Sequence, residues 1–158
     1  MQTITDTLNI HFDRSFQMLS AVMDACPAEF WAGTEENNSI WKRVLHVLES
    51  IDYRLTVGGD YLFPELFTGF SAEMDQISQS VVSKEKMSGY RDLMSRKITR
   101  FFEMVNDGML LERFSEKATF LDIILTQIRH IQNNVGYCSE LLRRNGGEGM
   151  EWLGYRER

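Results

Sequence analysis

The sequence lacks the features that mark membrane, secreted and nucleic-acid-binding proteins. No stretch approaches the roughly 20 apolar residues that span a bilayer, and the polar, periodic N-terminus has no signal-peptide core. The net charge is -6 and the isoelectric point is about 5.1. These values argue against a nucleic-acid binder, because such proteins usually present a basic face. We therefore expect a cytoplasmic protein with no membrane and no nucleic-acid partner.

Several catalytic motifs are also missing. The sequence has no glycine-rich phosphate loop and no nucleophile elbow, and it has no Glu-x-x-His pair of the kind found in ferritin-like di-iron bundles. Only two cysteines occur, Cys26 and Cys138, and neither belongs to a metal-binding pair or adjoins a histidine. Cys138 falls on an apolar helical stripe, so we interpret it as a buried thiol.

What the chain does contain is four amphipathic segments. Its 158 residues suit one domain, residues 1–158, which is large enough to bury a core without metal or disulfide bonds. Apolar residues recur every three or four positions over about residues 3–25, 40–57, 83–106 and 119–146. Capping threonines begin the first and last segments, Thr3 and Thr119, and glycines mark the ends of the last three. The pattern predicts four helices.

The connections between these segments differ in length. Residues 27–39 read as a loop rich in turn formers. Residues 59–82 contain Pro64 and several aromatic side chains, with a short helix expected near residues 71–81. Adjacent antiparallel helices need only a few linking residues, so this long connection favours parallel second and third helices. The predicted fold class is all-α, a four-helix bundle with a long crossover between helices two and three.

The last segment carries the most informative polar side chains. Beside its apolar stripe runs a second row that is polar in the middle: Ile123, Gln127, His130, Asn134, Tyr137 and Leu141. His130 and Asn134 lie one turn apart, the spacing at which two side chains can address one point. In the second segment, His46 projects away from the apolar face. It fits either a surface histidine or one at the bundle edge that faces a cleft.

Two motifs in these segments resemble the DinB superfamily: residues 41–47, WKRVLHV, and residues 130–136, HIQNNVG. Length, helix order, long crossover and small C-terminal tail agree with that family, so the resemblance covers most of the chain. It implies a four-helix bundle, often dimeric, with one nickel or zinc ion held by three histidines. Several members are enzymes that use low-molecular-weight thiols such as bacillithiol or mycothiol.

Carried onto this chain, the three ligand positions fall on His46, His130 and Asn134. The third position departs from the family, since an amide oxygen is a poor ligand for nickel or zinc beside imidazole. Asn133 is no substitute, because it lies a further 100° around the helix. Glu49 or Asp52 could complete a set of two histidines and one carboxylate, although the sequence places neither there.

Two interpretations therefore compete. In one, the chain is a divalent-metal-dependent enzyme of the thiol-transferase type with a degenerate triad, His46, His130 and Asn134, acting on a small molecule. In the other, it is a metal-free bundle that binds a small ligand or pairs subunits. The catalytic residues stay unassigned in both, and a bound nickel or zinc ion and no cofactor are equally plausible. The resemblance and the aromatic tail, Trp152 and Tyr155, predict a homodimer.

Overall fold

The computed structural model describes residues 1–33, 39–58, 60–75 and 80–154. These residues form four long helices: α1 (Ile4–Ala25), α3 (Ile40–Arg54), α4 (Lys84–Met104) and α5 (Phe120–Arg144). Three short helical segments lie between them: α2 (Ala28–Ala32) and the 3-10 turns η2 (Glu65–Phe67) and η3 (Asp107–Met109). Within the described ranges there is no strand, only one isolated bridge between Arg113 and Thr119. The predicted all-α class is confirmed.

The two longest of these helices begin with the same arrangement. Thr3 at the start of α1 and Thr119 at the start of α5 each accept a hydrogen bond from the backbone N–H three residues on. The aspartates at those positions, Asp6 and Asp122, accept in return from the threonine N–H. These bonds hold the pKa of both carboxyls below the usual value. Both helix starts predicted from the sequence are therefore confirmed, since each capping box satisfies two otherwise free donors.

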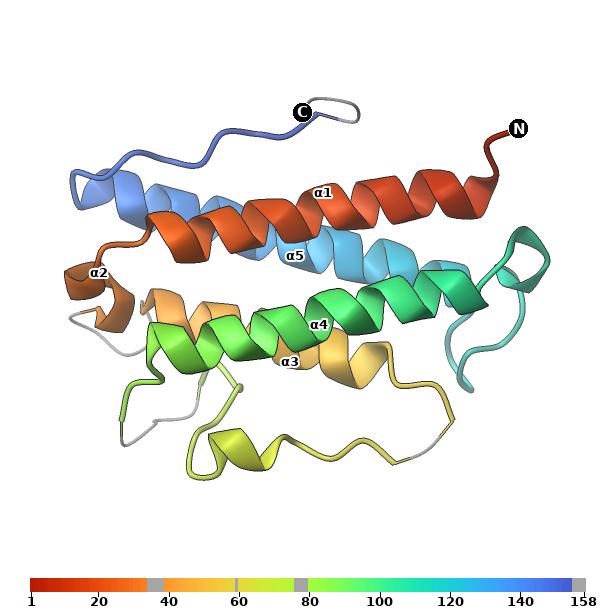
Figure 1. Cartoon of the computed structure of the whole chain (residues 1–158), viewed down its shortest axis with the longest axis horizontal. Coiled ribbons are helices and arrows are strands. Elements are labelled where there is room, and N and C mark those ends of the chain that lie inside the picture. Colours follow the sequence, from red (N-terminus) through yellow and green to blue (C-terminus); the bar gives the residue numbers. More distant parts are fainter. Residues whose placement is uncertain (34–38, 59, 76–79, 155–158) are drawn as a thin grey trace.

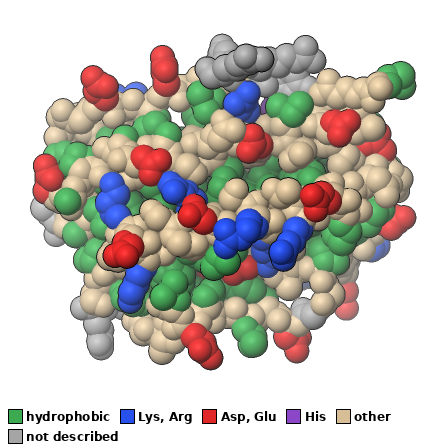
Figure 2. Space-filling model, in the orientation of Figure 1, with side chains coloured by type: hydrophobic (Ala, Val, Ile, Leu, Met, Phe, Trp, Pro, Cys, Tyr) green, Lys and Arg blue, Asp and Glu red, His purple; other side chains and the backbone are tan. Residues whose placement is uncertain are grey.

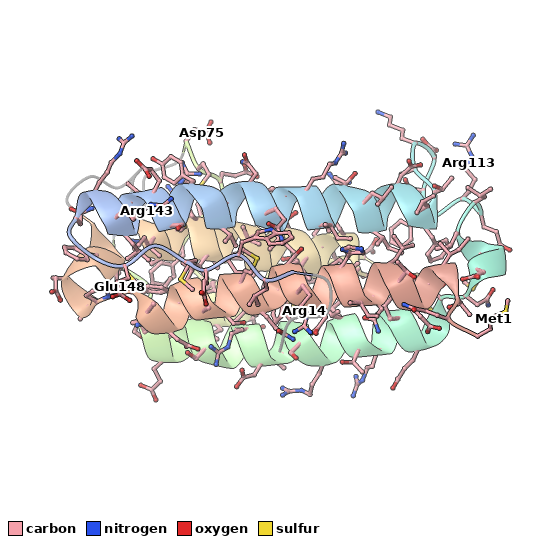
Figure 3. All side chains as sticks on the ribbon, turned by 90° about the horizontal axis from the view of Figure 1, so that it is seen from above. Met1, Arg14, Asp75, Arg113, Arg143 and Glu148 are labelled. Atoms are coloured by element: carbon pink, nitrogen blue, oxygen red, sulfur yellow. The ribbon has the colours of Figure 1, made fainter. Side chains whose placement is uncertain are left out.

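Figure 1 shows how the four long helices lie side by side. α3 and α4 run in one direction, while α1 and α5 run in the other. Between the end of α3 and the start of α4, residues 55–58, 60–75 and 80–83 lie along the length of the molecule. In Figure 3, Met1 and Arg113 lie at one end, and Arg143 and Glu148 at the other. Because α5 packs against α3 in the opposite direction, successive residues along α3 meet residues of α5 in reverse order.

Two local predictions were less accurate. A short helix, α2, interrupts the expected loop after Pro27, and its Trp31 is buried and donates from Nε1 to the Val82 carbonyl at 2.7 Å. This contact joins residues 51 positions apart, so local turn propensity cannot predict it. The short helix expected near residues 71–81 is not formed by residues 71–75 or 80–81, and residues 76–79 lie outside the described part.

The four long helices share one apolar core and carry charged side chains on their surface. Buried apolar side chains from all four long helices form one cluster, in which Cys138 is fully buried, as predicted. None of the helices described is both long and apolar enough to cross a bilayer. On the face in Figure 2, acidic and basic side chains are interspersed. In the tail, the Met150 N–H donates to Ser139, Trp152 is 69 % exposed, and Tyr155 lies outside the described residues.

Candidate functional site

Polar side chains of α3 and α5 meet along one line, which we call the polar seam: Arg43, His46 and Ser50 of α3 with Gln127, His130, Asn134 and Tyr137 of α5. The α3 members recur at intervals of three and four residues, and the α5 members do the same, so each set occupies one side of its helix. Antiparallel packing then pairs them in reverse order. Seven polar side chains thus interrupt an otherwise apolar interface.

The central pair of the seam is His46 and His130, which are 84 residues apart in sequence. Their Nε2 atoms are 3.0 Å apart, and the rings meet edge to face with centroids 4.9 Å apart at 83°. Both rings are partly buried. His46 is therefore not a fully exposed surface histidine: it is partly buried against α5, and the structure brings the two predicted histidines together.

A backbone carbonyl from the segment between α3 and α4 orients His46. Its Nδ1 lies 2.9 Å from the Ala72 oxygen, and a carbonyl can only accept, so Nδ1 carries the hydrogen. In the neutral ring the Nε2 lone pair therefore points at His130. Metal-binding histidines are oriented in this way, with the second ring nitrogen donating to a carbonyl or carboxylate.

His130 is held less completely. In the neutral pair its Nε2–H donates to His46, which leaves Nδ1 as a bare acceptor, and this buried atom has no hydrogen-bond partner among the described residues. Burial lowers the pKa of His130, and the nearby charges of His46 and Arg54 lower it further. The site therefore favours a neutral imidazole at position 130, the form in which a histidine can bind a metal.

The spacing of the two Nε2 atoms suits neighbouring ligands of one ion. Two nitrogens bound at about 2.0–2.1 Å lie roughly 2.9 Å apart at a 90° angle and roughly 3.4 Å apart in a tetrahedron. The separation of 3.0 Å falls in this range. Binding would require His130 to shift its hydrogen from Nε2 to Nδ1. The distance between these two atoms is thus compatible with two ligands of one ion, and it is equally that of the hydrogen bond between them.

Asn134 does not fit in the same way. Its Oδ1 accepts from the Arg43 guanidinium at 3.3 Å, and its Nδ2 donates to the His130 carbonyl at 2.9 Å. The amide is 4 % exposed, so both ends are engaged inside the interface. An oxygen already bound to a cation is poorly placed to donate to a second one.

Nearby carboxylates do not replace it. Asp52 is engaged on the other side of α3, by Lys97 and Tyr90. Glu49 is partly buried, which raises the pKa of its carboxyl, and it lines a pocket of about 200 Å³ with Phe63, Phe70 and Ala72. Across residues 1–33, 39–58, 60–75 and 80–154, no three His, Cys, Asp or Glu side chains are placed to hold a metal ion. The set of two histidines and one carboxylate is therefore not assembled by these residues.

A larger cavity lies further along the two helices. It has a volume of about 560 Å³ and is lined by Tyr53, Arg54 and Tyr61 on one side and by Phe114, Lys117 and Ile123 on the other. Ile123 precedes His130 by seven residues, or about 10 Å of helix. The cavity is thus separate from the histidine pair but lies on the same α3–α5 junction.

Comparison with known proteins adds no assignment. Searches against models of protein families, curated proteins and solved structures found no match.

The sequence reasoning missed how α3 completes the seam. The sequence indicates the polar row of α5 and the polar position of His46, but it does not pair that row with Arg43, His46 and Ser50 of α3. The shared spacing of three and four residues in both segments was the pattern that could have indicated the polar seam. The sequence does not give the relative register of the two helices, because that register depends on tertiary packing.

Proposed function

We propose that this chain is a DinB-like four-helix bundle whose His46 and His130 bind one divalent metal ion, nickel or zinc, beside a site for a small molecule. The observation that carries the proposal is the 3.0 Å approach of the two Nε2 atoms from distant parts of the chain. A low-molecular-weight thiol is the proposed substrate class, and the reaction would be of the transferase type. The parallel α3 and α4 with a long connection between them support the family resemblance.

The roles of the residues follow from their contacts. The Ala72 carbonyl holds His46 with Nε2 free to bind, and burial keeps His130 neutral. A metal bound there would lower the pKa of a thiol or water and provide a nucleophile at neutral pH. Two imidazoles alone leave further coordination positions open to such a molecule, but they also hold the ion less tightly than three would.

A second candidate function is a metal-free binding module. Its support is the Arg43–Asn134 contact at 3.3 Å, which sets a permanent positive charge at the position where the family has its third ligand. Repulsion between that cation and a divalent ion weakens metal binding. In this alternative the two histidines form a polar contact in a ligand-binding interface.

The deciding experiment measures metal affinity with and without a third imidazole. Metal-depleted protein is titrated with nickel and with zinc by calorimetry. We expect weak binding by the native chain and at least ten-fold tighter binding by Asn134→His, because the other two donors already converge. Combining Asn134→His with Arg43→Gln should tighten binding further by removing the opposing charge.

Matched controls identify the ligands. His46→Gln and His130→Gln should abolish the binding, whereas His11→Gln should leave it unchanged, since His11 is exposed on α1. If the native chain binds neither nickel nor zinc measurably, the metal proposal fails and the metal-free module stands, and a site gained in Asn134→His then shows only that the two histidines converge.

On the family resemblance we also propose a cytoplasmic homodimer, with the exposed Trp152 as a candidate contact. Light scattering should give twice the chain mass of 18.4 kDa. A single-chain mass at high protein concentration would contradict the dimer.

A further inference from the structure

Arg43 is a partly buried cation that forms no ion pair with a carboxylate of the described residues. Its guanidinium carbon lies 3.3 Å from the centroid of the Tyr137 ring, and its Nη1 donates to the Asn134 amide oxygen at 3.3 Å. Its Nε is buried and has no hydrogen-bond partner among the described residues. A guanidinium has five N–H donors, and only one of them has a protein acceptor in this part of the chain.

Among residues 1–33, 39–58, 60–75 and 80–154, no carboxylate forms an ion pair with this charge. The ion pairs formed within the described ranges use Arg91, Lys97, Arg143 and Arg144, and none involves Arg43. Desolvating a charge without pairing it is costly, and arginine cannot escape the cost by losing its proton. The chain carries 23 acidic residues, so the lack of a partner here is not explained by composition.

The surroundings hold the guanidinium in one orientation. Tyr137 covers one face of its plane, and the Asn134 amide fixes one end through Nη1. Asn134 is itself fixed by its bond to the His130 carbonyl. A fixed, planar fork of N–H donors matches the two oxygens of a carboxylate, and pre-orienting it reduces the entropy lost on binding.

The position of Arg43 relates it to the histidine pair. It precedes His46 by three residues on α3, about 4.5 Å along the helix and on the same side. We propose that Arg43 binds the carboxylate of a small anionic ligand, whose remaining atoms reach His46 and His130. Asn134 and Tyr137 act as positioning residues for the guanidinium.

This inference adds a substrate class, a small carboxylic acid, to the site proposed above. Its part in any reaction rests on that proposed function. Binding of the carboxylate itself does not, because Arg43 is charged whether or not a metal is present. A failure of metal binding and a failure of carboxylate binding are therefore separate results.

The experiment uses the full chain, depleted of metal, in the presence of a chelator and at constant ionic strength. Succinate is titrated while the arginine Nε–H signals are followed by heteronuclear NMR, with the uncharged diamide succinamide as the matched probe. We expect saturable shifts of the Arg43 signal with succinate and none with succinamide. Arg43→Gln should weaken succinate binding at least ten-fold, measured by calorimetry.

Two further variants locate the site. Arg54→Gln is the matched control, because Arg54 also lies on α3 and stacks on a tyrosine, with its guanidinium carbon 5.1 Å from the Tyr53 ring centroid; it should change affinity by less than three-fold. Arg43→Lys keeps the charge and the fold but loses the planar fork, and it should bind more weakly than the native chain. Equal shifts with both probes, no shift with succinate, or loss of binding in Arg54→Gln alone would each overturn the proposal.

Discussion

α3 presents two polar faces to its neighbours, and they differ in how fully their groups are paired. Towards α4, Lys97 donates to the carboxylate and the carbonyl of Asp52 and to the hydroxyl of Thr56. Tyr90 donates to the second carboxylate oxygen at 2.8 Å. Towards α5, the polar seam leaves Arg43 without a counter-ion and two buried nitrogens, one on Arg43 and one on His130, without partners in the described residues.

The difference separates a structural role from a functional one. A fully paired polar cluster fixes the register of two helices and gives a ligand nothing to bind. A buried donor or acceptor without a partner lowers stability, so its presence in a native protein calls for an explanation. In the polar seam both unpaired nitrogens lie on His130 or within one turn of the histidine pair, where the ligand proposed above would supply the missing partners.

The largest effect is expected when the paired polar cluster between α3 and α4 is disrupted. Asp52→Ala leaves the Lys97 ammonium with no carboxylate, and the two side chains are only 15 % and 27 % exposed, respectively. We expect the free energy of unfolding to fall by roughly 2–3 kcal/mol, somewhat less than for a fully buried pair. Chemical denaturation of the variant and of the native chain measures this difference in the free energy of unfolding. The control Asp92→Ala removes a 60 % exposed carboxylate and should change stability by less than about 0.5 kcal/mol; equal effects of the two variants would refute the contrast.

The same measurement on the polar seam should give a smaller effect. Arg43→Met keeps the length of the side chain and its contact with Tyr137 but removes the unbalanced charge. We expect the free energy of unfolding to change by less than about 1 kcal/mol, because relief of the buried cation offsets the lost bond to Asn134. A loss as large as that of Asp52→Ala would show that Arg43 is structural, and would weaken the assignment of the seam to ligand binding.

The sequence predicts most of the fold because the fold is locally encoded. Helix starts at Thr3 and Thr119 depend on residues three positions apart, and the four helices depend on a repeat of three and four residues. The end of α3 is less certain from sequence: it stops at Arg54, three residues before the expected end and ahead of Gly58. Terminal turns depend on packing as well as on stop signals.

Some features of the candidate site could likewise be predicted from the sequence, and others could not. That His46 and His130 approach each other was expected from the family resemblance, and each lies on the polar side of its own helix. Asn134 appears as an unsuitable ligand in the sequence, but only the structure pairs it with Arg43. The Ala72 carbonyl that orients His46 carries no sequence signal, because every residue has a carbonyl. Contacts of this kind require the tertiary structure.

The smallest expected effect concerns Glu49, on the part of α3 that faces the segment before α4. Burial raises the pKa of its carboxyl above the ordinary value of 4.5, so folding disfavours the ionised form. Its contribution to stability is therefore greatest below pH 4.5 and declines as pH rises through the interval between the ordinary and the raised pKa. Relative to Glu49→Gln, the native chain should be more stable at pH 4 than at pH 7, as measured by denaturation at both values.

Glu140→Gln supplies a control of opposite sign. Hydrogen bonds and charge from Arg144, with a smaller contribution from Arg143, lower the pKa of the Glu140 carboxyl, so its contribution is present above the ordinary pKa and is lost as pH falls through the lowered one. Relative to this variant, the native chain should be less stable at pH 4 than at pH 7. If both variants shifted in the same direction, Glu49 would not be a desolvated carboxyl. The side of α3 that faces the connecting segment would then be as well solvated as the outer surface of α5. The difference in hydrogen-bond pairing would then concern only the two faces of α3 that meet α4 and α5.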